Sequence, residues 1–68
     1  MGEYIKAELF AFRKKRNITQ EEVAHGVGVT RQTIIAIEKG NYTPSVFLAL
    51  KLAKFFNTNV EKLFHYEK

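Results

Sequence analysis

The sequence predicts an all-helical domain of about five short helices. Its 68 residues contain one proline and four glycines, and aliphatic residues recur at intervals of three and four along most of the chain. No stretch of useful length shows the alternation of apolar and polar residues that is typical of a half-buried strand. A chain of this length can close one modest core, so we expect a single compact domain over residues 1–68.

The first helix is expected to contain Ile5, Leu9 and Phe12 and to end near Asn17. Those three apolar residues fall at i, i+4 and i+7, so they would form one buried stripe on a helix. Four basic residues, 13–16, follow the stripe. Asn17 suits the end of the helix because asparagine tolerates the left-handed backbone conformation found there.

Two helices follow, each with a start and a stop signal. Thr19 is expected to cap the second helix, because Glu22 lies three residues further on in a capping-box pattern, and Gly28 should end it. Thr30 is expected to cap the third helix, and Gly40 should end it. The side chains predicted to enter the core are Val23, Ala24 and Val27 from the second helix and Ile34 and Ile37 from the third.

The fourth and fifth helices complete the predicted core. Pro44 and Ser45 should start a helix over about residues 46–56, and Asn57 should close it. A short helix is expected within the segment NVEKLF, followed by a polar tail. The core side chains predicted here are Leu48, Leu52 and either Phe55 or Phe56, with Val60, Leu63 and Phe64 from the last helix.

The composition argues against several classes of protein. A net charge of +4 favours polyanionic partners such as nucleic acid. The chain has no cysteine, no apolar run long enough to cross a membrane and no signal-peptide pattern, so we expect a cytoplasmic location and no membrane partner. His25 and His65 have no neighbour at a metal-ligand spacing, and Gly26 to Gly28 lack the strand that precedes a nucleotide-binding loop. We expect no enzyme activity, no metal and no cofactor.

The turn between the second and third helices suggests a way to bind double-stranded DNA. Two helices joined by such a short turn cross at a large angle, so the first can rest on the DNA backbone while the second enters the major groove. The early positions of the third helix carry hydrogen-bonding side chains. Arg31 can pair with guanine, Gln32 can pair with adenine, and Ala36 can touch a thymine methyl group.

Residues 18–45 also resemble a known family. They read ITQEEVAHGVGVTRQTIIAIEKGNYTPS, which is similar to the pattern LTQEELA…VGVSRQTI…IE.G…P of phage-repressor-like (Cro/repressor, or XRE) helix-turn-helix regulators. The resemblance implies a five-helix, lambda-repressor-like DNA-binding domain with its helix-turn-helix at about residues 19–39. It also implies a homodimer that binds a palindromic operator and acts as a transcriptional repressor, as in small stand-alone members that end soon after VEKLF.

The resemblance assigns roles to individual residues. Base contacts would come from Arg31, Gln32 and Ala36, with Ile35 beside them, and Arg13 and Glu38 would form a structural ion pair between the first and third helices. The DNA-backbone contacts implied by the pattern are Gln20, Thr30, Thr33, Lys39, Asn41 and Tyr42. Thr30 would be a helix cap as well. Residues 14–16 could either contact phosphates or only keep the surface soluble.

The chain departs from the family pattern around Phe10. Positions that are usually polar in the family are apolar or small here, which leaves open a second interface for a further protein partner. The residues predicted for this surface are Ala7, Phe10, Ala11, His25 and Gly26. The alternative function is therefore a protein-interaction or assembly module, such as an antitoxin-like subunit or an engineered helix-turn-helix scaffold. Alternatively, Phe10 could simply fold down onto the core.

A homodimer interface is expected within residues 55–66. The apolar residues there are more numerous than the small core needs, and in similar stand-alone regulators this region joins the subunits. The predicted interface residues are Phe55, Phe56, Leu63, Phe64 and Tyr66. A dimer would place two recognition helices about 34 Å apart, one turn of DNA. The sequence leaves open whether the twofold axis passes here or through the Phe10 surface.

Overall fold

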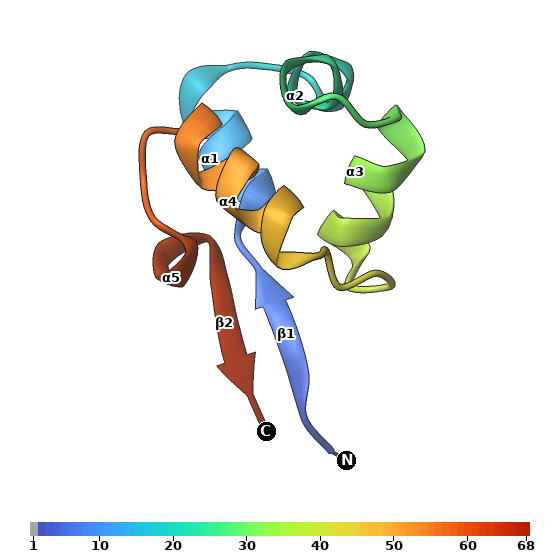
Figure 1. The fold of residues 1–68 in the computed structure, drawn as a ribbon, viewed down its shortest axis with the longest axis vertical. Helices are drawn as coiled ribbons and strands as arrows, with labels where there is room; N and C mark the ends of the chain where they lie inside the picture. Colours follow the sequence, from blue (N-terminus) through green and yellow to red (C-terminus); the bar gives the residue numbers. More distant parts are fainter. Residues whose placement is uncertain (1) are drawn as a thin grey trace.

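The structure is a computed structural model that describes residues 2–68. They form five helices and one two-stranded antiparallel sheet, in the order β1 (Tyr4–Ala7), α1 (Leu9–Arg16), α2 (Gln20–Val27), α3 (Arg31–Lys39), α4 (Val46–Phe55), α5 (Val60–Leu63) and β2 (Phe64–Glu67). The helices make a rounded body, and the two strands extend from it as a ribbon whose tip lies near both ends of the chain (Figure 1). The whole molecule measures 33 × 22 × 22 Å. The five predicted helices are confirmed.

The capping residues begin and end the helices as predicted. The hydroxyl of Thr19 accepts a hydrogen bond from the backbone amide of Glu22 at 3.0 Å, and the Glu22 carboxylate accepts one from the amide of Thr19 at 2.7 Å. This reciprocal pair satisfies two amides that a helix N-terminus would otherwise leave unpaired. Residues with left-handed backbone conformation end the first three helices, at Asn17, Gly28 and Gly40.

The prediction that no strand would form is wrong at both ends of the chain. Ile5 does not belong to the first helix but to β1, which pairs with β2 so that Ile5 lies opposite Tyr66 and Ala7 opposite Phe64. The residues after α5 therefore form a strand and not a polar tail. The backbone amide of Glu8 donates to the carbonyl of Leu63 at 2.8 Å, so the chain is held in the ribbon up to the start of α1. Each strand has four residues, too few to produce a clear alternation in the sequence.

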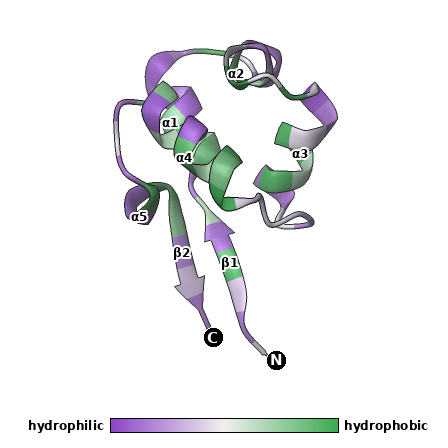
Figure 2. Cartoon of the chain, in the orientation of Figure 1, coloured by the Kyte–Doolittle hydropathy of each residue, from purple (hydrophilic) through white to green (hydrophobic). Residues whose placement is uncertain are grey.

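The core lies between the helices and is closed below by the ribbon. Its buried apolar side chains are Leu9, Val23, Ala24, Val27, Ile34, Ile37, Leu48, Leu52, Ala53, Phe56 and Leu63. They include most of the predicted core residues. Of the others, Phe12, Val60 and Phe64 are only partly buried against this cluster, and Ile5 lies in β1. In Figure 2 most of α4 is coloured as hydrophobic, and three of its large apolar residues are exposed, so α4 is apolar on more than its core side.

Two residues of the predicted dimer interface belong to this core. Phe56 is 2% exposed and Leu63 is fully buried, so neither has surface left for a second subunit, and their assignment to the interface is wrong. Phe56 is enclosed because Phe12 and Phe55 both pack edge-on against its ring. Phe55 and Phe64 are half-buried, and only Tyr66 of the predicted set is exposed.

Candidate nucleic-acid interface

Helices α2 and α3 form the helix-turn-helix. Only residues 28–30 separate them. In Figure 1 α2 is seen nearly end-on and α3 from the side, so the two helices cross at a large angle. The start of α3 consequently stands at the edge of the molecule, as entry into a DNA groove requires.

The first turn of α3 presents free polar side chains to solvent. Thr30 caps the helix, since its hydroxyl accepts from the amide of Thr33 at 3.3 Å and lies 3.2 Å from the Thr33 hydroxyl. The next two residues, Arg31 and Gln32, are exposed, and neither side chain forms a hydrogen bond or ion pair with another of residues 2–68. Ala36, one turn later, is half-buried. The capped helix end thus offers Arg31 and Gln32 to an outside partner.

A largely buried ionic network sets the position of α3. Arg13 of α1 donates to Glu38 of α3 from Nε at 2.7 Å and from Nη2 at 3.0 Å, and it donates from Nη1 to the carbonyl of Ile18 at 3.2 Å. The amide nitrogen of Gln20 of α2 donates to the same carboxylate at 3.0 Å. The hydrogen bonds and charge of Glu38 raise the pKa of Arg13, although burial acts in the opposite direction. One carboxylate therefore joins all three N-terminal helices.

A polar hollow lies beside the start of α3. It has a volume of about 580 Å³ and is lined by Arg13, Lys14, Asn17, Ile18, Thr19, Gln20, Glu21 and Arg31. The first residues of α2 form one wall, and the amides of a helix N-terminus favour an anion such as phosphate. Basic side chains from α1 and α3 border the same hollow. The predicted backbone contact Gln20 and the predicted base contact Arg31 thus share one concave surface.

The remaining predicted backbone contacts lie at the other end of α3. Lys39 and Asn41 are exposed there. Tyr42 is 46% exposed and, with Tyr4 and Tyr66 of the ribbon, borders a second hollow of about 320 Å³. The ribbon therefore adjoins the loop after α3, an arrangement that the sequence did not predict.

The structure changes the interpretation of the Phe10 surface. Phe10 is 56% exposed on α1, with the guanidinium of Arg13 and the ammonium of Lys14 over its ring at 5.3 and 5.8 Å. Ala11 is exposed on the same helix. Ala7 lies in β1 and not, as expected, in the first helix with Phe10 and Ala11.

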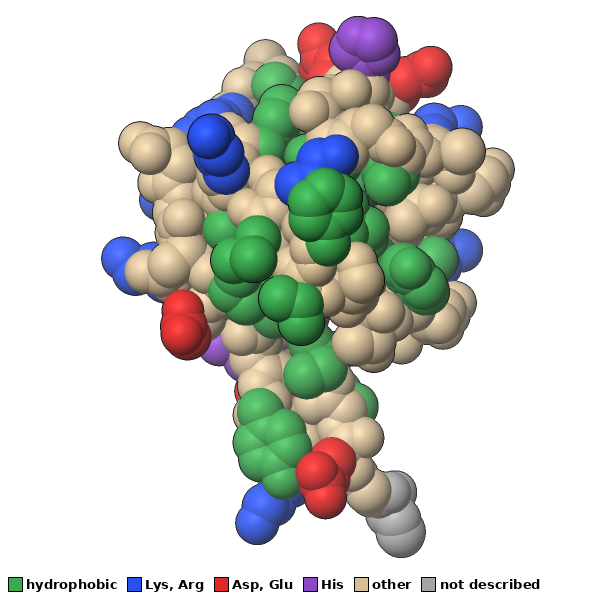
Figure 3. Space-filling model, viewed as in Figure 1, with side chains coloured by type: hydrophobic (Ala, Val, Ile, Leu, Met, Phe, Trp, Pro, Cys, Tyr) green, Lys and Arg blue, Asp and Glu red, His purple; other side chains and the backbone are tan. Residues whose placement is uncertain are grey.

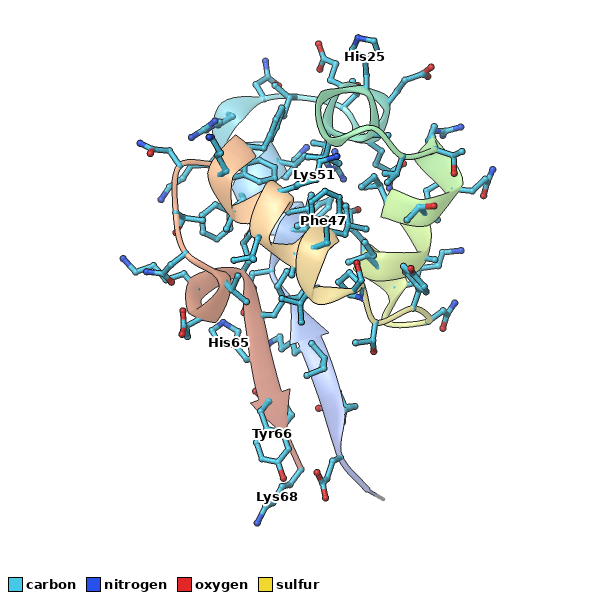
Figure 4. The ribbon with its side chains drawn as sticks, viewed as in Figure 1. His25, Phe47, Lys51, His65, Tyr66 and Lys68 are labelled. Atoms are coloured by element: carbon cyan, nitrogen blue, oxygen red, sulfur yellow. The ribbon has the colours of Figure 1, made fainter. Side chains whose placement is uncertain are left out.

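His25 and Gly26 lie on α2. His25 projects from the outer end of the molecule in Figure 4 and borders a shallow hollow with Glu21 and Glu22. The space that a side chain at Gly26 would occupy is filled by the ring of Phe55, whose Cδ1 lies 2.8 Å from the position of such a Cβ. The glycine is therefore explained by the close packing of α4 on α2.

The sequence interpretation missed two further features. Arg16 donates to the carbonyls of Phe55 and Phe56 at 3.2 and 2.6 Å, so it ties the end of α1 to the end of α4. The outer side of α4 exposes three large apolar residues, Val46, Phe47 and Leu50. A signal for the second feature was present, because the segment has more apolar residues than one core-facing stripe needs.

None of the helices within residues 2–68 is long and apolar enough to cross a membrane. Over the same residues, no three side chains of His, Cys, Asp or Glu lie together in an arrangement that could hold a metal ion.

Comparisons with known proteins agree with this geometry. The helix-turn-helix family matches residues 9–63. An HTH-type transcriptional regulator of Methanocaldococcus jannaschii is 54% identical over 63 residues, which cover 93% of this chain and 96% of the relative. The regulator YgzD of Bacillus subtilis is 44% identical over 64 residues, which cover 94% of this chain and 97% of YgzD.

Two further proteins are similar to this chain over less of their length or at lower identity. The cryptic phage CTXphi transcriptional repressor RstR of Vibrio cholerae is 43% identical over 51 residues, or 75% of this chain and 46% of RstR. The crystal structure of the transcriptional regulator VanUg shares the fold, with a TM-score of 0.81 at 18% identity over 98% of this chain and 89% of VanUg. The family match covers most of the chain, and its relatives are named as transcriptional regulators. This chain belongs to the phage-repressor-like (Cro/repressor, XRE) helix-turn-helix family of transcriptional regulators.

Proposed function

We propose that this protein is a sequence-specific DNA-binding transcriptional regulator that places α3 in the major groove. The observation that carries the proposal is the exposure of Arg31 and Gln32 on the first turn of a helix held by the buried Arg13–Glu38 pair. Rigid support matters because base readout requires side chains to be held in a defined position. Ala36 lies further along the same helix, where it can meet a thymine methyl group.

Phosphate contacts on both sides of α3 would set the register of the protein on DNA. On one side, the polar hollow between α1 and α2 brings Gln20 and the N-terminus of α2 together with Lys14. On the other side, the exposed residues Lys39, Asn41 and Tyr42 follow the helix. The hydroxyls of Thr30 and Thr33 lie at the start of α3. Such contacts position the protein and carry little sequence information.

The regulator acts as a homodimer on a palindromic operator in this proposal, and it represses transcription. Twofold symmetry in the protein requires two half-sites about 34 Å apart, centre to centre. A phage repressor among the relatives supports repression as the direction of control. The protein would act where the chromosome is, in the cytoplasm, and would have no catalytic role.

The alternative is a protein-interaction module that uses Phe10. One observation favours it: the Phe10 ring is exposed to solvent next to Ala11. Against it, Arg13 and Lys14 already cover part of the ring, and an exposed cation–π contact stabilises by about 0.5–1 kcal/mol. DNA binding therefore remains the better-supported function.

Selection of binding sites from random DNA, followed by salt titrations, tests the proposal. We expect a palindromic site bound about 10³-fold or more tightly than a scrambled duplex of the same length. Affinity should fall steeply with salt because phosphate neutralisation releases counterions. Equal affinity for selected and scrambled duplexes would refute sequence-specific binding, and the Phe10 module would then become the better explanation.

A further inference from the structure

The outer side of α4 carries an exposed apolar ridge. Val46 is 76% exposed, Phe47 is 72% exposed and Leu50 is 56% exposed. In the view of Figure 3 hydrophobic side chains gather over α4 and continue onto the ribbon, and Figure 4 places Phe47 and Tyr66 on this same face. Single exposed apolar residues are common, but a contiguous group of this kind marks an interaction site.

An apolar groove lies directly beside the ridge. It has a volume of about 150 Å³ and runs between the start of α4 and the ribbon, with Val46 and Ala49 on one side and Ile5 and Phe64 on the other. Pro44, Thr43 and Val60 complete its lining. Val46 belongs to both features, so the ridge and the groove are continuous.

We propose that a second copy of this chain docks on the face formed by the α4 ridge and this groove. In a twofold contact the same surface meets itself, so a projection beside a depression is what each copy must offer the other. The ridge of one copy would fill the groove of its partner, and the partner's ridge would fill the first groove. A partner of another kind could use the ridge or the groove alone, so the presence of both side by side favours a second copy of this chain.

The size of the face fits such a contact. At their observed exposures, the three ridge residues present on the order of 400 Å² of surface, about half of the ~800 Å² that each partner contributes to a typical stable interface. The groove and the adjoining Tyr66 supply further area. The ammonium of Lys51 lies over the Phe47 ring at 5.2 Å and marks a charged rim on the C-terminal side of the ridge.

The location also suits two recognition helices on one DNA duplex. Residues 40–45 connect the end of α3 to the start of α4, where the ridge is concentrated. A contact at this point would fix the spacing between the two copies of α3. The role of this contact in DNA binding rests on the proposed function, but the contact itself can be measured without DNA.

The test is the molar mass in solution, by size-exclusion chromatography with light scattering and no DNA. We expect the parent protein to have twice the 7.9 kDa mass of one chain. The variants Phe47→Lys and Leu50→Lys should each have the mass of a single chain at the same protein concentration. Phe10→Lys is the matched control, since it charges an aromatic of similar exposure on α1 and should remain dimeric. Circular dichroism checks that each variant keeps its helices.

A second measurement does not depend on a charge. The chain has no cysteine, so a single introduced thiol can form a disulfide only with another copy. We expect mild oxidation to produce a covalent dimer from at least one of Val46→Cys, Phe47→Cys and Leu50→Cys, and none from Ala11→Cys. A monomeric parent, or dimers that persist in both lysine variants on α4, would overturn the inference. If the lysine variants break the dimer as expected but the parent protein shows no preference among DNA sequences, the proposed function alone is refuted.

Discussion

Arg13 and Glu38 form a two-bonded ion pair that joins α1 to α3, with N–O distances of 2.7 and 3.0 Å. Their side chains are only 11% and 8% exposed, and Gln20 donates a third hydrogen bond to the carboxylate. Removing one partner of a buried pair leaves the other charge without compensation, which costs far more than losing a surface salt bridge. The pair therefore controls both stability and the position of the recognition helix.

Arg13→Met should destabilise the protein by about 3–5 kcal/mol, because Glu38 would remain charged and largely buried. For a domain of this size each kcal/mol lowers the melting temperature by about 4–8 °C. The double variant Arg13→Met/Glu38→Leu should cost much less than the sum of the two single variants, since no buried charge remains. Additive losses in thermal melts would show that the pair is not coupled.

The same variant has a predictable pH dependence. Glu38 raises the pKa of Arg13 in the folded protein, so the stabilisation is fully present below the pKa of arginine in the unfolded chain. It is lost only as the pH rises through the still higher folded value. The loss of stability in Arg13→Met should therefore be the same at pH 7 and pH 9.

Gly26→Ala should lower the melting temperature, although alanine normally stabilises a helix by about 1 kcal/mol relative to glycine. The new methyl group would collide with the Phe55 ring, which would have to move from its place against α2. In a Phe55→Leu background the collision is relieved, so the same substitution should raise the melting temperature. If Gly26→Ala stabilises the parent protein, the close contact has no energetic consequence.

Arg16→Gln should destabilise the protein by about 1–2 kcal/mol through loss of charged hydrogen bonds to the end of α4. It should leave DNA affinity nearly unchanged at temperatures well below the melting transition. Lys15→Gln, a matched loss of charge at an exposed neighbour, should not affect the melting temperature. A large loss of affinity in Arg16→Gln without a change in stability would assign Arg16 to phosphate binding instead.

Arg31→Ala and Lys39→Gln should weaken DNA binding in different ways. Arg31→Ala should cost about 1–3 kcal/mol on the selected site and relax the preference at one base pair. Lys39→Gln should weaken binding to all sequences about equally and reduce the salt slope by about one. Anisotropy titrations with selected and scrambled duplexes at several salt concentrations separate the two patterns. An equal loss on both duplexes for Arg31→Ala would remove it from base readout.

Local signals in the sequence predicted the helices and their ends. Thr19, Thr30 and Ser45 cap helices as expected, because a capping side chain bonds an amide only three residues away. Asn59, for which no cap was predicted, does the same for α5. The exposure of Arg31 and Gln32 follows from the same short-range pattern, since Ile34 and Ile37 occupy the buried side of α3. The Arg13–Glu38 pair was predicted only through the family resemblance.

Contacts between distant segments were decided by the tertiary structure. The sequence by itself determined where α2 and α3 begin and end and which polar residues lead α3, because those features depend on neighbours within one or two helical turns. It did not determine that Ile5 would pair with Tyr66, which of Phe55 and Phe56 would enter the core, or that Phe55 would fill the space at Gly26. Each of these depends on chain segments that meet only when the core closes, so no local pattern of apolar residues could reveal it.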